Sequence, residues 1–250
     1  MNILFVADTH DGLYNEELEA IIEYINNNRI VLDGIISCGD VTSLDFYRLI
    51  ASGLSNIPNY PIYGVLGNHD MWNTQKNYSV VDLSEKAKEI YGVTFTGLSG
   101  SVRYKNEDCP MMTQEESLER AEDIPDADIF ITHDKPLFSE DIIKEDAHSG
   151  LKGIGKYIEE HKRCKLHIYG HMHEFSISKR KGCTSVCIYK WCLANINEQL
   201  EFSSLYSYLD YWNYNHFPGK IEWKINIVEP IPKPVKIKRF NLFGKNKKYC

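Results

Sequence analysis

Five short polar fragments, each placed directly after an apolar segment, constrain the fold of this chain more than any other feature. The fragments are Asp8-Thr9-His10, Gly39-Asp40, Gly67-Asn68-His69-Asp70, His133 and Gly170-His171-Met172-His173. The apolar segments resemble strands, and segments that resemble helices lie between them. This alternation indicates an α/β fold with a substantially parallel sheet. In open α/β sheets the functional site lies outside the carboxyl ends of the strands. We therefore expect the five fragments to converge on one edge.

The predicted elements follow from the spacing of the apolar residues. Strands are predicted at 2–7, 31–38, 61–66, 94–98, 102–104, 128–132 and 165–169, and helices at 15–28, 44–54, 81–91 and 151–161. Looser β segments are expected at 176–178, 184–189 and 221–228. Prolines at 230, 232 and 234 mark the end of the compact domain. We thus expect a catalytic domain over 1–229 and a basic, flexible tail over 230–250.

The side chains of the fragments are oxygen and nitrogen ligands, and none is a thiolate. Asp8 and His10 are two residues apart, so in an extended segment both point to one face and can hold one ion. His171 and His173 repeat this arrangement. Asp40 is the natural bridge, because a carboxylate can give one oxygen to each of two metals. The ligand types favour Mn²⁺, Fe²⁺ or Zn²⁺ without choosing among them, and we expect Mn²⁺; a pair of such ions commonly serves phosphate-ester hydrolysis.

Charge is unevenly distributed along the chain. The net charge is −7, yet residues 231–250 carry seven Lys or Arg and no acid, which leaves 21 basic against 35 acidic residues before them. An acidic body suits metal capture and argues against extensive nucleic-acid binding. The tail, where Phe240 and Phe243 lie among the basic residues, allows two interpretations. It is either an attachment site for nucleic acid or a solvated, disordered terminus.

Neither a membrane span nor a cleaved signal peptide is expected. No run of eighteen apolar residues occurs, and the first residues form a strand pattern that leads directly into Asp8. Among the seven cysteines, Cys183, Cys187 and Cys192 match no zinc spacing, so we expect them to be structural. Reduced thiols indicate a cytoplasmic location.

The motifs read D-x-H, G-D, G-N-H-[D/E], H and G-H-x-H, and in this order they make the chain resemble the calcineurin-like metallophosphoesterase superfamily. The resemblance runs from Asn2 to about His173. Segments 97–104 and 147–150 look like those of small bacterial and phage-like members. The fold that this resemblance implies is α/β, with two packed sheets flanked by helices in an α/β/β/α sandwich.

The resemblance also implies a role for each motif residue. One metal would be held by Asp8, His10 and His173, the second by Asn68, His133 and His171, and Asp40 would bridge the two ions. A metal-bound hydroxide would attack phosphorus in line, and His69 would protonate the leaving group. The implied activity is that of a phosphatase or phosphodiesterase. Alternatives are a nuclease or nucleotide phosphohydrolase with the same core, and a non-catalytic metal-binding scaffold.

One stretch departs from the protein Ser/Thr phosphatase branch, which reads G-D-x-x-D-R-G. Here the stretch is Gly39-Asp40-Val41-Thr42-Ser43-Leu44-Asp45, with Ser43 where the Asp that orients the catalytic His would stand. The departure argues against a protein phosphatase. Asp45 and Asp70 are the candidates to orient His69 instead.

Three further features have more than one interpretation. His148 could contact substrate or orient a metal ligand, or it could simply begin a helix before Ser149. Arg103 could bind phosphate or pair with an acid on its strand. The aromatic cluster at 206–214 could form a lid, a platform for stacking bases or part of the core.

Overall fold

Two six-stranded mixed sheets form the centre of the computed structural model, which describes residues 1–10, 12–52, 54, 62–77, 80–142 and 146–216. The first sheet has the order β14 (Phe202–Ser207), β13 (Lys190–Ile196), β1 (Asn2–Ala7), β2 (Gly34–Ser37), β3 (Ile62–Gly64) and β4 (Val81–Asp82). Strands β1 to β4 pair in parallel, and β13 and β14 are antiparallel to their neighbours. The predicted strand 221–228 and the tail 230–250 lie outside the described residues, so the predicted domain boundary stays a prediction.

The second sheet has the same mixed character. Its order is β11 (Ser176–Arg180), β12 (Cys183–Cys187), β10 (Leu166–Tyr169), β9 (Ile129–Thr132), β6 (Val93–Leu98) and β5 (Lys88–Ile90). The four central strands are parallel, and β11 and β5 are antiparallel edges. Strands β7 (Ser101–Val102) and β8 (Met111–Met112) form a small separate pair.

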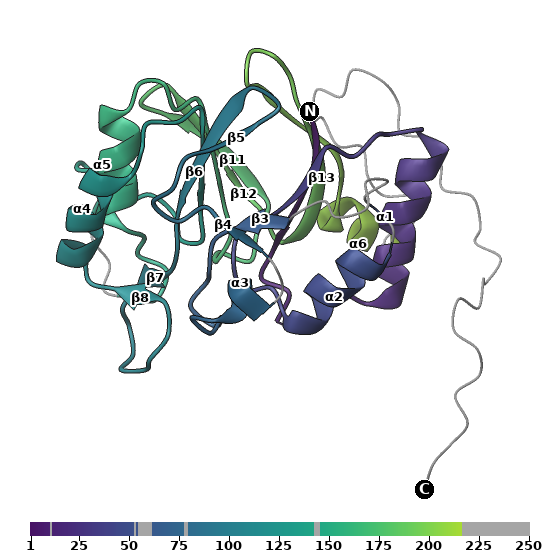
Figure 1. Cartoon of the computed structure of the whole chain (residues 1–250), viewed down its shortest axis with the longest axis horizontal. Coiled ribbons are helices and arrows are strands. Elements are labelled where there is room, and N and C mark those ends of the chain that lie inside the picture. The colour runs from purple at the N-terminus through teal and green to yellow at the C-terminus, as the bar shows by residue number, and fades with distance from the viewer. Residues whose placement is uncertain (11, 53, 55–61, 78–79, 143–145, 217–250) are drawn as a thin grey trace, which may run out of the picture.

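Helices cover the outer face of each sheet (Figure 1). Helices α1 (Asn15–Asn27), α2 (Ser43–Ala51) and α6 (Tyr208–His216) lie beside the first sheet, and α4 (Gln114–Asp123) and α5 (Lys152–Glu160) beside the second. The short α3 (Thr74–Asn77) follows β3. The helices and the sheets give the layers α/β/β/α, so the predicted fold is confirmed. No helix in the described part of the chain is both long and apolar enough to cross a membrane.

Strand β1 explains why the sheets pack in this way. Ile3 and Phe5 belong to the core between the two sheets, whereas Leu4 and Val6 pack in the core beneath α1 and α2. Successive strand side chains point to opposite faces, so a strand buried on both faces must be apolar without interruption. A third core, which includes Phe130 of β9, packs under α4 and α5.

The helix predicted at 81–91 is wrong. The segment forms β4 at the edge of the first sheet and β5 at the edge of the second, with a bridge from Ser84 to Gly97 between them. Leu83 and Ile90 are buried in the core between the sheets. Local helix propensity is overridden here because the segment must cross from one sheet to the other.

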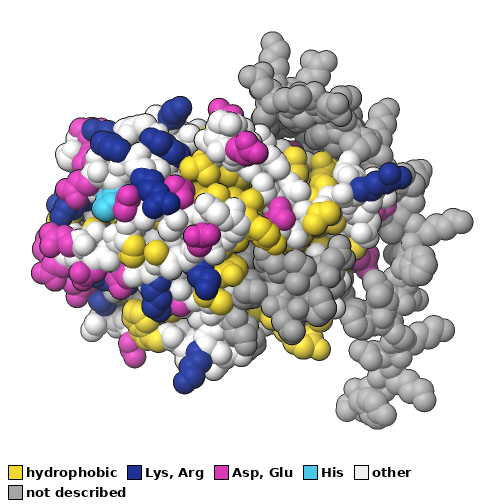
Figure 2. Space-filling view, turned by 45° about the horizontal axis from the view of Figure 1, so that its top comes forward, with side chains coloured by type: hydrophobic (Ala, Val, Ile, Leu, Met, Phe, Trp, Pro, Cys, Tyr) yellow, Lys and Arg dark blue, Asp and Glu magenta, His cyan; other side chains and the backbone are white. Residues whose placement is uncertain are grey.

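Charged side chains of both signs mix at the end of the molecule where α4 and α5 lie (Figure 2). Lys156 lies 3.0 Å from Glu122, and Arg163 lies 2.8 Å from Asp128. Exposed pairs of this kind contribute little to stability, roughly 0–1 kcal/mol each. The mixed charge suits a solvated helical face.

His167 of β10 makes folding sensitive to acid. Its ring is fully buried, with Nε2 2.8 Å from Thr132 Oγ1 and Nδ1 3.2 Å from Ser185 Oγ, and burial lowers the pKa of His167 to about 3. In the unfolded chain the pKa of His is about 6.5, so between pH 6.5 and 3 only the unfolded chain takes up this proton. We expect His167 to remove about 2 kcal/mol of unfolding free energy between pH 7 and pH 5.

Denaturant unfolding at pH 7 and pH 5 measures this contribution. His167→Gln should lose less stability on acidification than the wild type, even if it is less stable at pH 7. His161→Gln, at a partly exposed histidine, is the matched control and should keep the wild-type dependence. Equal pH dependence in the wild type and His167→Gln would contradict the assignment.

Candidate active site

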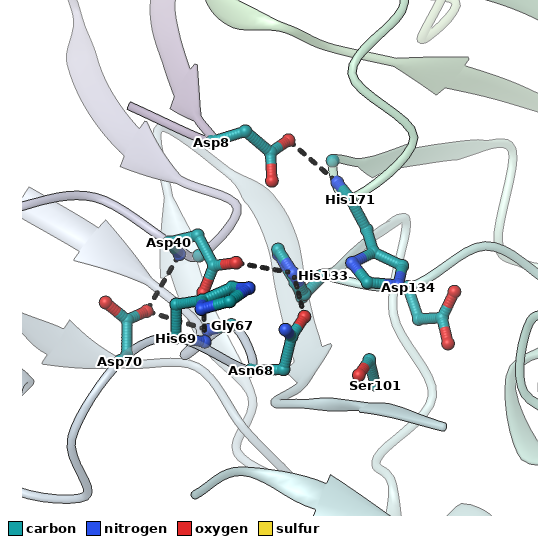
Figure 3. A network of polar contacts seen from close by, with 12 residues as sticks. Asp8, Asp40, Gly67, Asn68, His69, Asp70, Ser101, His133, Asp134 and His171 are labelled. Carbon is teal, nitrogen blue, oxygen red and sulfur yellow. Dashed lines mark hydrogen bonds and ion pairs between the residues drawn. The ribbon is translucent and has the colours of Figure 1, made fainter. Parts of the chain in front are cut away.

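The five polar fragments meet where the carboxyl ends of the two sheets come together. Asp8 and Asp40 follow β1 and β2, and Asn68 follows β3, all in the first sheet. His133 and His171 follow β9 and β10 of the second sheet. Figure 3 shows these side chains turned toward one another from both sheets. The predicted convergence is therefore present, but it is built from two sheets.

Asp8, His10 and His173 form the first group of ligand atoms. Asp8 Oδ1 lies 4.0 Å from His10 Nε2 and 3.7 Å from His173 Nε2, and the two Nε2 atoms are 3.1 Å apart. Asp8 is buried, whereas both imidazoles are exposed. The group is therefore open to solvent on its histidine side, where a ligand can enter.

Asp40, Asn68 and His133 form the second group. His133 Nε2 lies 3.0 Å from Asn68 Oδ1 and 3.3 Å from Asp40 Oδ2, and the His133 and His171 ring centroids are 4.9 Å apart. Asp40 thus lies within reach of His133, and its Oδ2 is also 3.8 Å from His10 Nε2 of the first group. This position between the groups is the one expected of a bridging ligand.

Backbone carbonyls orient the two buried imidazoles. His133 Nδ1 lies 2.9 Å from the Cys38 carbonyl, and His171 Nε2 lies 2.7 Å from the Ala147 carbonyl. A carbonyl only accepts, so each of these nitrogens carries a hydrogen, which leaves the other ring nitrogen as the one able to bind a metal. Fixing the tautomer in this way is typical of metal-ligating histidine.

Two buried carboxylate atoms test whether the site fits a cation. Asp8 Oδ1 and Asp40 Oδ2 are buried and make no hydrogen bond with any described residue. Burial raises the pKa of Asp8 to about 7. Burial also opposes the charge of Asp40, but His133 beside it holds the pKa of Asp40 well below its usual range. Buried anionic oxygens without hydrogen bonds are costly unless a cation is near, so the donor set fits divalent ions.

The pKa of His133 also reflects the need of the buried carboxylates for a nearby positive charge. Burial alone would lower it, yet the charge of Asp40 and its close approach raise the pKa of His133 to about 10. In the metal-free protein a proton on Nε2 thus offsets the carboxylates. A bound metal ion would replace this proton and offset the negative charge of the carboxylates.

Backbone conformation at the ligands is unusual. Asp8, Asp40, His171 and His173 have φ values of 53°, 54°, 67° and 52°, in the left-handed region that few non-glycine residues adopt. Such residues cluster at functional sites, where the surrounding fold holds them in place. Four of the seven predicted ligands share this property.

Gly67 allows the loop after β3 to approach Asp40. A Cβ on Gly67 would lie 2.1 Å from Asp40 Oδ1, and the Gly67 N–H donates to Asp70 Oδ2 at 2.7 Å. We expect Gly67→Ala to displace the Asp40 carboxylate and to remove most of the thermal stabilisation that Mn²⁺ gives. Melting curves with and without Mn²⁺ measure this effect.

Gly182→Ala is the control for Gly67→Ala. Gly182 has φ +87° and no atom within 4 Å of its would-be Cβ, so this change costs about 1–2 kcal/mol of backbone strain and no contact. Its Mn²⁺ shift should match the wild type. A normal Mn²⁺ shift in Gly67→Ala would show that the close approach is unimportant.

His69 lies beside the predicted metal ligands and is exposed to solvent. Its backbone N–H donates to Asp40 Oδ1 at 2.7 Å, and its ring lies 4.8 Å from the His10 ring, edge to face. Asp70 Oδ2 accepts from the backbone N–H groups of Asp40 and Gly67, and Asp45 accepts from Leu13 N. The contacts of both acids thus hold loops around the site.

The two further candidates have different surroundings. The His148 ring lies 4.8 Å from the His171 ring, which places it beside a predicted ligand. Arg103 Nη2 donates to the Met111 carbonyl at 2.7 Å and lies 3.9 Å from Glu116. The contacts of Arg103 are those of the structural alternative, an arginine paired with an acid.

Sequence reasoning missed Tyr104. Its hydroxyl accepts a hydrogen bond from Asn68 Nδ2 at 3.1 Å, which turns Asn68 Oδ1 toward His133. Tyr104 belongs to the segment 97–104 that the resemblance had marked, but nothing in its local pattern indicates this contact.

The three cysteines are buried in the protein interior, whereas the aromatic cluster contributes both to the core and to a pocket. Cys183, Cys187 and Cys192 are buried, in agreement with a structural role. Tyr206 stacks on Tyr24 with centroids 4.5 Å apart and packs on the core under α1, as the core interpretation predicts. Other rings of the cluster line a pocket, described below.

A family model of the calcineurin-like phosphoesterase superfamily domain matches residues 1–189. The chain belongs to this family. This phosphoesterase is therefore a hydrolase of phosphoester bonds, and it contains groups of side chains able to hold divalent metals. No curated protein matches the chain.

Several solved structures are similar to this phosphoesterase at low identity. A Staphylococcus aureus protein assigned as a 5′-nucleotidase has 15% identity and a TM-score of 0.44, with 82% of this chain and 53% of that chain covered. This chain thus spans about half of that protein's length. An archaeal phosphodiesterase has 16% identity and a TM-score of 0.44, with 82% and 99% covered. A phosphopantetheinyl hydrolase from Mycobacterium tuberculosis has 12% identity and a TM-score of 0.44, with 76% and 89% covered.

Proposed function

We propose that this phosphoesterase holds two divalent metal ions and uses them to cleave a phosphomonoester or phosphodiester. The buried Asp8 Oδ1 and Asp40 Oδ2, which lack hydrogen bonds among the described residues, are the observation that carries the proposal. One ion would be held by Asp8, His10 and His173. The other would be held by Asn68, His133 and His171, and Asp40 would be a ligand of both. When bound, the ions would lower the pKa of a water molecule and offset the charge of the phosphoryl oxygens.

The protein's own side chains supply orientation and a proton. Tyr104 fixes the Asn68 amide, and backbone carbonyls fix the His133 and His171 rings. His69 stands on the open side near His10, where its ring can donate a proton to the leaving oxygen. Asp70 holds the backbone of Asp40 and Gly67 in register, which supports the position of Asp40.

A metal-binding scaffold without catalysis is less well supported. The chain carries every predicted ligand, the site is open at His10 and His173, and the exposed His69 lies where it could act as the acid. Mn²⁺ is our proposed metal, because the donors are oxygen and imidazole nitrogen, and Fe²⁺ and Zn²⁺ suit the same donors.

Hydrolysis of two model substrates tests the proposal. p-Nitrophenyl phosphate and bis-p-nitrophenyl phosphate are compared with added Mn²⁺. A preference for the diester would assign a phosphodiesterase, and a preference for the monoester would assign a phosphatase. If the protein hydrolyses neither of these compounds nor any other phosphoester, the proposed function is overturned.

A further inference from the structure

A pocket of about 260 Å³ opens beside His173, next to the candidate metal site. Its lining includes Tyr189 before β13, Tyr208 and Trp212 of α6, and Phe175. His173 belongs to both places: Nε2 lies 3.7 Å from Asp8 Oδ1, and the ring stacks on Tyr189 with centroids 5.4 Å apart. A substrate with its phosphorus at the metal ligands can therefore extend directly into the pocket.

The pocket presents rings and few available polar groups. The Ser207 hydroxyl donates to Asp210 Oδ2 at 2.7 Å, and Glu174 Oε1 accepts from Ser176 Oγ at 3.0 Å. The Ser207 hydroxyl and one oxygen of Glu174 are thus engaged within the protein, while the aromatic surfaces of Tyr189, Tyr208 and Trp212 form the wall. Such a wall attracts a flat ring by stacking in addition to the burial of its apolar surface.

Contacts behind the wall hold the rings in place. Tyr208 meets Tyr189 edge to face at 5.4 Å and 87°. Lys190 Nζ lies 4.8 Å from the centre of the Tyr208 ring and 3.0 Å from Glu17 Oε1, and both charged side chains are buried. A buried cation beneath the ring, fixed by a buried acid, makes Tyr208 a pre-organised surface, which lowers the entropy cost of binding.

We propose that this pocket binds a planar aromatic ring of the substrate, such as a nucleobase or aryl group, while the phosphoryl group lies at the Asp and His ligands. The inference rests on the proposed function, since it names the substrate class of the same site. The volume is below the roughly 300–1,000 Å³ of pockets for drug-sized ligands, which suits one ring system. The ring stacks between the wall and solvent, and selectivity comes from its planarity.

Binding of benzylphosphonate and methylphosphonate to the Mn²⁺-loaded full chain, measured by calorimetry, tests this inference. The two probes have the same charged group, and their carbon–phosphorus bond is not an ester, so turnover does not interfere. Stacking of one ring predicts that benzylphosphonate binds at least about fivefold more tightly. Trp212→Ala and Tyr208→Ala should each bring this ratio close to one, and Trp212→Phe should keep most of it.

Tyr214→Ala is the matched control, because Tyr214 is a half-exposed ring of α6 outside the pocket. Its ratio should equal that of the wild type. Equal affinity for both probes in the wild type would show that the pocket does not bind the ring, and would overturn the inference. So would a wild-type ratio in both alanine variants. A high ratio in a chain that hydrolyses no phosphoester would retain the ring site and reject the proposed function, whereas rapid hydrolysis with a ratio of one would do the reverse.

Discussion

Replacing Asp40 with Asn is expected to lower phosphoester hydrolysis by at least about a thousandfold while the fold is retained. Asp40 Oδ1 accepts from the His69 N–H, and Oδ2 lies 3.3 Å from His133 Nε2 and 3.8 Å from His10 Nε2. Asn keeps the shape of the side chain but removes the charge shared by both ligand groups. A loss of about 4 kcal/mol of transition-state stabilisation corresponds to this factor. Initial rates with bis-p-nitrophenyl phosphate and circular dichroism measure the two properties.

Asp126→Asn is the control for Asp40→Asn. Asp126 pairs with His161 at 3.1 Å, and neither residue is among the predicted metal ligands. The control should retain the wild-type rate. Full activity in Asp40→Asn would rule out the proposed bridging role.

His69→Gln is expected to lower turnover by about 10²- to 10⁴-fold without loss of bound metal. The His69 ring lies edge to face with His10, and its hydrogen bond to Asp40 comes from the backbone N–H, which the substitution keeps, so the buried ligands should stay in place. The loss should be small for a p-nitrophenyl ester and large for an alkyl ester, because the poorer leaving group needs the proton more. Rates with both esters and the metal content of the purified variant measure this difference.

His161→Gln serves as the control for His69→Gln, since His161 contacts Asp126 and stacks on Tyr157. Loss of metal from His69→Gln together with activity would make His69 a ligand and remove it as the acid. An equal loss for both esters would likewise contradict proton donation.

The sequence was informative wherever the deciding interaction is local. Strand β1 is recognisable because both of its faces are buried, so its residues are apolar without a break. The polar residue after each strand marks the strand's carboxyl end, which is why Asp8, Asp40, His133 and His171 could be placed together in advance. Helix α4 was missed, although Thr113 and Glu116 form a reciprocal cap at its start that the sequence does contain.

The remainder depends on contacts between distant segments. Strand β13 pairs antiparallel with β1 across more than 180 residues of chain, and no local pattern predicts this register. The same holds for the helix wrongly predicted at 81–91, whose apolar residues are buried by two different sheets. Within the site, the Asn68–Tyr104 hydrogen bond and the close approach of Gly67 to Asp40 arise only after the loops meet.

Titration of the metal-stripped chain with Mn²⁺, with metal binding and hydrolysis of bis-p-nitrophenyl phosphate and p-nitrophenyl phosphate followed together, tests the dinuclear site most directly. We predict no hydrolysis without metal and a rate that saturates as two ions bind per chain, with Asp40→Asn inactive throughout. Full hydrolysis by the stripped chain, or saturation at a single ion, would contradict a two-metal phosphoesterase.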